Sequence, residues 1–242
     1  MQRYFLELQY KGTHFAGFQK QPNAVTVQGC IEDALQLVTK KNIELTGSSR
    51  TDTGVHALQN FFHFDMDGEF HPRWIYNLNA ILHADIVIKK VEAVHADAHC
   101  RFDAISRTYN YHIYQKKNPF LKETAFFYHY ALDIHLLNEA AAILKTYTDF
   151  TSFSKRNTQV FTHNCNIIES EWFLEENLLI YKVTSNRFLR GMVRALVATM
   201  LKVGRGQTSI DEFKKIIEAK NNLLAKFDAP GHGLFLMKVN YP

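Results

Sequence analysis

The sequence predicts an α/β (α+β) protein with two similar halves, residues 1–103 and 104–242, and a cleft where they meet. The 242 residues are 46% hydrophobic and 21% charged, which suits one large globular domain or two modest ones. Apolar positions alternate with a period of two in some segments and recur at helical spacing in others, and these segments interleave. Low-complexity segments, long linkers and short repeats are absent from the sequence, so we expect compact structure throughout.

The first expected elements lie before residue 47. Residues 3–10 alternate like a strand. Thr26 is a candidate N-cap for a helix whose apolar residues recur at helical spacing: Val27, Ile31, Leu35 and Val38. A short strand is expected at 43–46, directly before a loop with the sequence GSSRTDTGVHA at 47–57.

The next elements complete the first half. Residues 58–66 are expected to form a strand, with these side chains on one face: Leu58, Phe62, Phe64 and Met66. Pro72 opens a helix that extends to residue 82, because proline is favoured in the first turn. A further strand is expected at 85–94, which makes the first half roughly β-α-β-β-α-β.

The second half begins with a strand at 104–115 that carries Tyr109, Tyr111 and Ile113 on one side. The remaining expected elements are a helix near 133–146, a hairpin around Glu176 and Asn177, a helix at 187–203, a helix at 210–220 and a closing strand at 234–241.

Charge and cysteine content exclude several classes of protein. The chain has 28 Lys and Arg against 24 Asp and Glu, and a net charge of +4 is compatible with a local basic surface without proving a nucleic-acid partner. Cys30, Cys100 and Cys165 are far apart and indicate neither a disulfide framework nor a cysteine zinc site. The N-terminal residues lack a signal-peptide layout, and no apolar run could span a membrane. We therefore expect a soluble, cytoplasmic protein.

The loop at 47–57 surrounds one carboxylate, Asp52, with hydroxyl side chains, two glycines and Arg50. Such an aspartate can simply form a turn by accepting hydrogen bonds from nearby backbone N–H groups. Glycosidase chemistry needs a second facing carboxylate and a two-metal nuclease needs several, whereas the next acids are Asp65 and Asp67. A lone ionised Asp fits a nucleophile better, and Arg50 would help to keep it ionised.

Neither a metal nor a nucleotide cofactor is predicted. His95 and His99 have the i, i+4 spacing that brings two ligands together on a helix, but they fall between two expected strands. Residues 204–206, Gly-Arg-Gly, are too few for a phosphate-binding loop and are interpreted as a helix C-cap.

Basic side chains gather in the expected helix at 187–203. At helical spacing Arg187, Arg190 and Arg194 fall within a narrow stripe opposite the apolar residues. This stripe is either a solvated helix face or a row of cations that meets phosphates or a carboxylate.

A second basic group combines with tyrosines along residues 101–111. Tyrosines that alternate on a strand are usually core residues. Together with Arg101 and Arg107, however, Tyr109 and Tyr111 could also stack on a base while its phosphates are held.

Six motifs along the whole chain resemble those of the tRNA pseudouridine synthase A family, in order and in spacing. They are YKGTHFAGFQKQ, TVQGCIEDAL, GSSRTDTGVHA, RFDAISRTYNY, NRFLRGMVRALV and APGHGLFLMKVNYP. The resemblance implies two α/β halves around a continuous, mainly antiparallel sheet, with the active site in the central cleft. It also implies a homodimer that isomerises uridine to pseudouridine at positions 38–40, in the anticodon arm of tRNA, without any cofactor.

The resemblance assigns a role to each motif residue. Asp52 would be the catalytic nucleophile, and Arg50 would help to flip the target nucleotide. Tyr109 would stack on the uracil, and Leu234 would line the other side of the base. Arg101 would contact the tRNA and assist flipping.

The resemblance also implies roles for the arginines of the helix expected at 187–203. Arg194 would pair with Asp52, and Arg187 and Arg190 would complete the basic face. The chain departs from the family pattern at 229–231, where it has Ala-Pro-Gly and many members have Ala-Pro-Pro. It also departs at 83–84, where it has His-Ala and many members have a proline before Asp-Ile. These departures affect loop geometry and the Leu234 assignment more than the function.

Two other functions fit parts of the pattern. A tRNA-binding protein that acts as a folding chaperone would need the basic surface without the chemistry. An Asp-dependent hydrolase, such as a nucleosidase acting on small molecules, is disfavoured by the missing second carboxylate and by the arginine stripe. The sequence also does not decide whether Asp52 attacks carbon 6 of the uracil or the anomeric carbon of the ribose.

Overall fold

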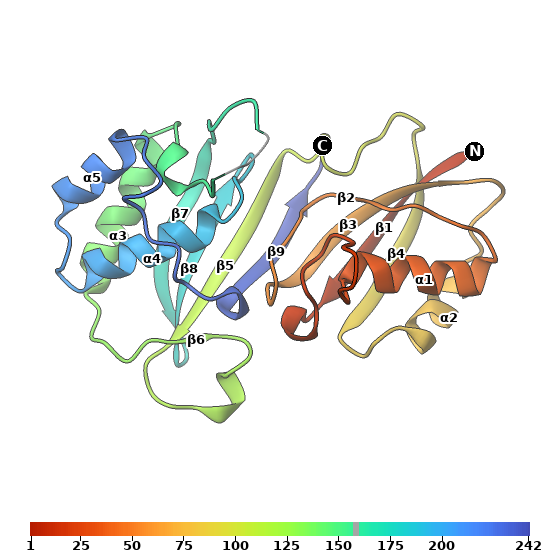
Figure 1. Ribbon diagram of the computed structural model, residues 1–242, viewed down its shortest axis with the longest axis horizontal. Helices are drawn as coiled ribbons and strands as arrows, with labels where there is room; N and C mark the ends of the chain where they lie inside the picture. Colours follow the sequence, from red (N-terminus) through yellow and green to blue (C-terminus); the bar gives the residue numbers. More distant parts are fainter. Residues whose placement is uncertain (157–159) are drawn as a thin grey trace. The chain divides into compact units, whose positions relative to one another are not determined.

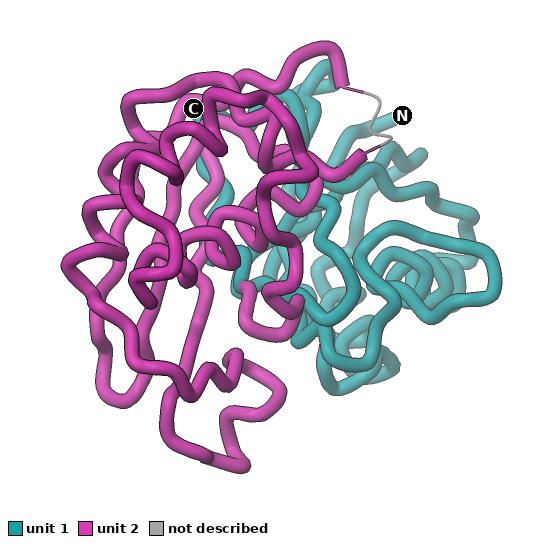
Figure 2. Tube along the Cα trace, turned by 60° about the vertical axis from the view of Figure 1, so that its left-hand side comes forward, with its two compact units in different colours: residues 1–105, 235–242 teal, residues 106–234 magenta. Residues whose placement is uncertain are grey.

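The computed structural model describes residues 1–156 and 160–242, which form two compact units (Figure 2). Unit 1 comprises Met1–Ile105 and Phe235–Pro242, and unit 2 comprises Ser106–Leu234. Across the described residues, nine strands and five α-helices form a mixed α/β fold with mainly antiparallel pairing, which confirms the predicted fold class. Within the same ranges, no helix is both long enough and apolar enough to cross a membrane.

Unit 1 is built on the first strand. Strand β1 pairs antiparallel with β3 on one side and with β4 on the other, and β9 pairs parallel with β3. The short β2 pairs antiparallel with β3. The elements are β1 (Gln2–Tyr10), α1 (Val27–Thr39), β2 (Thr46–Gly47), β3 (His56–Met66), α2 (Arg73–Ile81), β4 (Ile86–Val94) and β9 (Leu234–Asn240).

Side-chain pattern and capping explain why these segments fold as they do. In β1 every second side chain is buried, from Tyr4 to Tyr10, as the period of two predicts. Helix α1 begins after Thr26, whose hydroxyl accepts a hydrogen bond from Gly29 N at 3.2 Å. Helices α1 and α2 contact each other, and α2 contacts β4 (Figure 1).

Two expectations for unit 1 are wrong. The strand expected at 43–46 begins only at Thr46, as β2, because the backbone of Leu45 is satisfied by side chains of α1: Gln28 Nε2 donates to its carbonyl at 2.8 Å, and its N–H donates to Glu32 Oε1 at 3.2 Å. Leu58 is 47% exposed instead of packing with the other apolar residues of β3. A register shift between β1 and β3 causes this, because it places an extra residue at this point of β3 and changes which side chains face the core.

Unit 2 contains a smaller set of strands, in the order β5-β8-β7, which are antiparallel to one another, while β6 pairs parallel with β5. The predicted hairpin joins β7 to β8 through Glu176 and Asn177. The elements are β5 (Ser106–Tyr114), β6 (Phe126–Phe127), α3 (Ile134–Ile143), β7 (Ile167–Glu175), β8 (Leu178–Ser185), α4 (Met192–Gly204) and α5 (Ile210–Glu218). The 3-10 turns in the described part of both units are η1 (Gly12–His14), η2 (Pro119–Leu121), η3 (Leu144–Thr146), η4 (Thr151–Phe153) and η5 (Gly231–Gly233).

The core of unit 2 lies between its strands and its helices (Figure 1). Nearly all of α4 is buried, and α3 and α5 both contact it. On the strands, Tyr111 and Tyr181 are fully buried, and Tyr181 stacks on Trp172 with ring centroids 5.0 Å apart. Helix α5 begins with a capping box formed by Ser209 and Glu212.

The helix expected at 187–203 begins five residues later than predicted. Gly191 has a φ of 74°, in the left-handed region, and is the N-cap of α4. In a helix that began at Arg187, the Arg190 carbonyl would accept from the N–H of residue 194, but it accepts from Lys155 N at 3.0 Å. The three-arginine helical stripe is therefore wrong: Arg187 and Arg190 lie in the preceding loop, and only Arg194 lies on α4.

Candidate active site

The loop that carries Asp52 connects β2 to β3 and is held by backbone hydrogen bonds. Ser48 N donates to Phe61 O at 2.8 Å, and Phe18 N donates to Thr51 O at 3.1 Å. A turn follows, closed by Val55 N donating to Asp52 O at 3.2 Å, and Gly54 takes the left-handed conformation there with a φ of 76°. The backbone is thus bonded on both sides of the carboxylate.

A buried network of polar side chains supports the Asp52 loop. The Tyr10 hydroxyl lies 2.7 Å from Thr51 Oγ1. Asn60 Nδ2 donates to the Tyr10 hydroxyl at 3.2 Å and to Ser49 O at 2.9 Å. Because these groups are buried, removing one partner would leave the others unsatisfied, so the network fixes the residue directly before Asp52.

Two glycines allow the segment after β1 to lie directly against the loop. A Cβ at Gly12 would lie 2.1 Å from Val55 O, far closer than atoms can approach. Gly12 N also donates to His56 Nδ1 at 3.0 Å. Gly17, with a φ of 108°, lies against Thr51 O in the same way, with a Cβ distance of 3.2 Å. Any side chain at Gly12 would displace the turn that presents Asp52.

The fixed backbone exposes the charged groups and buries their neighbours. Thr51 and Val55 are buried, whereas Asp52 is half-buried and Arg50 is exposed. A carboxylate that is partly solvated on a rigid turn can act on a bound substrate without first rearranging the protein. This geometry suits the nucleophile that the sequence predicts for Asp52.

Arg101 belongs to the same unit and is exposed. Its guanidinium carbon lies 5.6 Å from the ring centroid of Phe102, which is itself 73% exposed. The adjacent Cys100 is buried and anchors the segment, because its Sγ donates to Thr46 O at 3.1 Å and its carbonyl accepts from the Tyr241 hydroxyl at 2.6 Å. Arg101 and Phe102 therefore project from a fixed position.

A buried histidine, His63, contacts the same cysteine. Cys100 N donates to His63 Nδ1 at 3.3 Å. Burial, and then the neighbouring His99 and Arg3, lower the pKa of His63 to about 4. His63 is therefore neutral at neutral pH, and its unprotonated Nδ1 is an acceptor for this N–H.

The remaining predicted residues belong to unit 2. Tyr109 lies on β5, is 9% exposed, and its ring meets Phe188 edge to face with centroids 5.0 Å apart. Arg194 lies in the first turn of α4, and its Nε donates to Ala229 O at 2.6 Å. This bond uses one of the five donor hydrogens of the guanidinium. Leu234 is buried at the start of β9.

The segment around Leu234 is positioned by β5 and α4. The Tyr111 hydroxyl donates to Pro230 O at 2.8 Å, next to the carbonyl that Arg194 holds. Burial raises the pKa of Tyr111, so this phenol stays protonated and donates. A Cβ at Gly233 would lie 2.8 Å from the Tyr111 ring, so only glycine fits there.

The two further arginines differ in exposure. Arg187 is half-buried and Arg190 is exposed, and both follow the end of β8. Sequence reasoning missed the groups that hold the Asp52 loop, Tyr10 and Asn60. Tyr10 closes an alternating strand and Asn60 lies within an apolar one, and a polar side chain in an apolar strand is the signal that could have indicated a buried network.

Comparison with known proteins gives first the family and then several individual relatives. A family model described as tRNA pseudouridine synthase matches residues 8–103 and 140–242. The chain is 46% identical to tRNA pseudouridine synthase A of Bacteroides fragilis, over 100% of this chain and 97% of the relative. It is 44% identical to the protein of the same name from Parabacteroides distasonis, over 100% and 97%. It is 38% identical to that from Staphylococcus carnosus, over 98% and 90%. The chain belongs to the tRNA pseudouridine synthase family.

Proposed function

We propose that this protein converts uridine to pseudouridine at positions 38–40 of the tRNA anticodon arm, with Asp52 as the nucleophile. Membership of the family makes the protein an isomerase that acts on tRNA. The observation that carries the finer proposal is the half-buried carboxylate of Asp52 on a turn whose backbone is bonded on both sides.

The first step is access to the base. A uridine within a stacked arm must be extruded before its glycosidic bond can be reached, and new contacts must offset the lost stacking. Arg50 and Arg101, both exposed, would hold the emptied position and the phosphate backbone. Tyr109 would stack on the flipped uracil, with Leu234 on its other side.

The chemistry conserves every atom of the substrate. Asp52 attacks carbon 6 of the uracil or the anomeric carbon of the ribose, and on either route the glycosidic bond between the anomeric carbon and nitrogen 1 breaks. The ring then turns, carbon 5 bonds to the anomeric carbon, and the bond to Asp52 breaks, which frees the carboxylate. The carbon 5 proton leaves and nitrogen 1 gains a proton. In this proposal the Tyr109 hydroxyl takes the carbon 5 proton, and Arg194 stabilises the Asp52 carboxylate by opposing its charge.

The assembly and location are proposed on the same basis. We propose that the protein acts as a cytoplasmic homodimer in which one tRNA contacts both subunits, as the family resemblance implies. Arg187 and Arg190 would add contacts to the tRNA phosphates from the loop before α4.

Replacing the nucleophile tests the proposal. Asp52→Asn keeps the size of the side chain but removes the carboxylate, so pseudouridine formation in an anticodon-arm transcript should be abolished. Affinity for tRNA should stay within about tenfold, because one carboxylate contributes little to binding a polyanion. Asp67→Asn is the matched control, since Asp67 is an exposed acid of the same unit outside the proposed site, and this variant should keep full activity.

Three results would contradict the proposal. Turnover near that of the unsubstituted protein in Asp52→Asn would remove Asp52 as the nucleophile. Full rescue of a strain lacking the gene by Asp52→Asn would favour a tRNA-binding protein that works without chemistry. Turnover of free uridine instead of whole tRNA would favour the hydrolase class. Mapping pseudouridine in tRNA from cells that lack the gene tests the proposed positions.

A further inference from the structure

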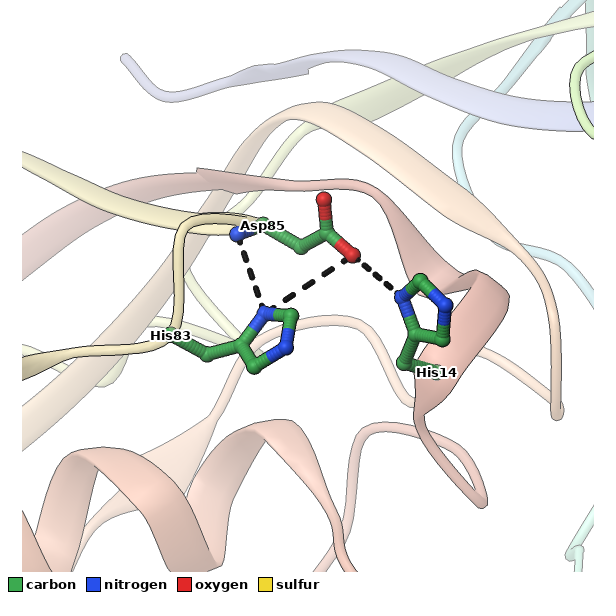
Figure 3. A group of neighbouring side chains, drawn as sticks. All are labelled: His14, His83 and Asp85. Atoms are coloured by element: carbon green, nitrogen blue, oxygen red, sulfur yellow. Dashed lines mark hydrogen bonds and ion pairs between the residues drawn. The ribbon is translucent and has the colours of Figure 1, made fainter.

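Two imidazoles and a carboxylate converge at the end of unit 1's first strand (Figure 3). His14 belongs to the η1 turn after β1, whereas His83 and Asp85 lie between α2 and β4. Asp85 Oδ2 lies 2.6 Å from His14 Nδ1 and 3.7 Å from His83 Nδ1. Within residues 1–156 and 160–242, these three form the one group of His, Cys, Asp or Glu side chains with metal-ligand proximity.

The backbone that carries these side chains is fixed by the sheet. Tyr10 pairs with Ile86 at the end of the β1–β4 ladder, and the next residue, Lys11, donates its N–H to Asp85 O at 2.9 Å. Ile86 N donates to His83 O at 2.9 Å, which closes the turn. The three groups are therefore held together from segments about seventy positions apart, and their proximity does not depend on side chains alone.

We propose that His14, His83 and Asp85 bind a divalent transition-metal ion of the Zn²⁺ class. Two imidazole nitrogens and one carboxylate oxygen are donors that suit Zn²⁺, Co²⁺ and Ni²⁺ and do not favour Mg²⁺ or Ca²⁺. Ligand atoms about 2.1 Å from a tetrahedral ion lie about 3.4 Å apart, so the His83–Asp85 separation is already close to what is needed. The shorter His14–Asp85 pair opens by less than about 1 Å when the ion replaces its hydrogen bond.

Exposure and protonation also suit an ion. The side chains of His14 and His83 are 59% and 51% exposed, so an ion can reach them, and the Asp85 side chain is only 20% exposed. Asp85 N donates to His83 Nδ1 at 3.1 Å, which identifies this nitrogen as the unprotonated one that can offer a lone pair. When the ion binds, it replaces the Asp85 N–H as the partner of this lone pair, and water completes the coordination on the exposed side.

The chain contains its own control for this site. The tripeptide His-Ala-Asp occurs twice, at 83–85 and at 95–97. The second copy has the same His Nδ1 to Asp Oδ2 distance of 3.7 Å, and Asp97 N faces His95 Nδ1 at 3.4 Å. The difference between the two is His14, which supplies a third ligand to the first copy alone among the described residues.

Metal binding at this site would strengthen the segment that supports the Asp52 loop. His14 follows Gly12 by two residues, and Gly12 donates to His56 and lies against Val55. An ion that ties η1 to the start of β4 therefore stabilises unit 1, because it binds the folded arrangement and not the unfolded chain.

Zinc titration of tag-free protein by calorimetry tests the proposal. We expect one Zn²⁺ per chain, undisturbed by excess Mg²⁺, and Co²⁺ in its place should give the visible absorption of a site with nitrogen and oxygen ligands. His14→Gln and Asp85→Asn should each weaken Zn²⁺ affinity by at least about tenfold, whereas His95→Gln should leave it unchanged. Zn²⁺ should raise the melting temperature of the unsubstituted protein and of His95→Gln, but not that of His14→Gln.

The opposite results overturn the site. They are an absence of stoichiometric Zn²⁺ binding, equal affinity in His14→Gln and the unsubstituted protein, or loss of binding on alkylation of the cysteines instead of on removal of the histidines. Because His14 is exposed, His14→Gln should fold normally, and its metal-free melting temperature serves as the check.

Discussion

Gly12→Ala should misplace the Asp52 loop while adding only one methyl group. The new Cβ would lie 2.1 Å from Val55 O, 2.7 Å from Val55 C and 3.0 Å from Gly54 C, all of them backbone atoms of the turn. Ordinary contacts begin near 3.4 Å, so the Val55 carbonyl must move by about 1.3 Å, the difference between the two distances. A backbone neighbour has no other rotamer to adopt, so the turn itself must shift.

The segment that carries Gly12 cannot easily move instead. Lys11 N is bonded to Asp85 O, and Gly12 N is bonded to His56 Nδ1. The displacement therefore falls on the turn, and Asp52 moves with it because its carbonyl is bonded to Val55 N. A misplacement of about 1 Å at a reacting group can cost about a hundredfold in rate. We expect kcat/KM to fall by about a hundredfold, or about 2.7 kcal/mol, and tRNA affinity to change little.

Single-turnover conversion of an anticodon-arm transcript, normalised to folded protein by a thermal melt, measures this effect. Gly29→Ala is the control, because Gly29 lies in α1 of the same unit and its added Cβ would meet only Thr26 Oγ1, at 3.1 Å. That variant should keep its rate, since alanine suits a helix better than glycine. A Gly12→Ala protein that folds and converts uridine at the rate of the unsubstituted protein would refute the argument that this contact positions Asp52.

Three further outcomes are expected. Tyr109→Phe should bind tRNA normally but stall after cleavage of the glycosidic bond. Tyr109→Leu should also bind the target nucleotide poorly, since base stacking is worth about 1–3 kcal/mol. Normal turnover in both variants, with lower melting temperatures, would make Tyr109 a core residue only. Arg101→Ala should lower the slope of log tRNA affinity against log salt by about one. Lys182→Ala is the control and should leave the slope unchanged, because the Lys182 ammonium already faces Glu169. Equal slopes in the two variants would exclude a phosphate contact by Arg101. The pKa of His63 is about 4 in the folded protein and 6.5 in the unfolded chain, so the unfolded chain takes up the proton first as the pH falls. The contribution of neutral His63 to the free energy of unfolding, about 3 kcal/mol, is therefore complete above pH 6.5 and is lost as the pH falls toward 4. Urea unfolding at neutral and acidic pH should show a smaller acid loss for His63→Gln, and an equal loss would contradict the assignment.

Local rules predicted much of the fold from sequence. The alternation in β1 and the cap at Thr26 are readable because each depends on residues close together in the chain. The predicted order of the first half, β-α-β-β-α-β, is confirmed for the same reason.

The errors arise where distant groups override a local pattern. The apolar spacing after Arg187 is helical, yet Lys155 takes the carbonyl that such a helix would need, and Gly191 turns the chain instead. Leu45 lies next to the Asp52 loop in an apparent strand, yet side chains of α1 satisfy its backbone. Sequence spacing carries no information on these partners.

The candidate site also contains residues that the sequence indicates and contacts that it does not. Asp52 and Arg50 stand out because charged and hydroxyl residues interrupt an otherwise apolar pattern. The contacts from Tyr10 and Asn60 hold Thr51 and Ser49 of the Asp52 loop, and they link segments that are distant in the chain, so they could not be read from spacing. The proximity of His14, His83 and Asp85 could not be read from spacing either, because His14 lies far along the chain from His83.

The parallel pairing of β9 with β3 affects the order in which a nascent chain can mature. His56, which follows the Asp52 turn, pairs with Phe235, and their rings stack with centroids 4.5 Å apart. The polypeptide that carries Asp52 leaves the ribosome long before residues 235–242, so the turn lacks this support during most of translation. Unit 2, which is continuous from Ser106 to Leu234, can fold before unit 1 acquires β9. A ribosome-bound chain that has not yet reached Phe235 would therefore hold the Asp52 turn without the strand pairing and ring contact that β9 supplies at His56.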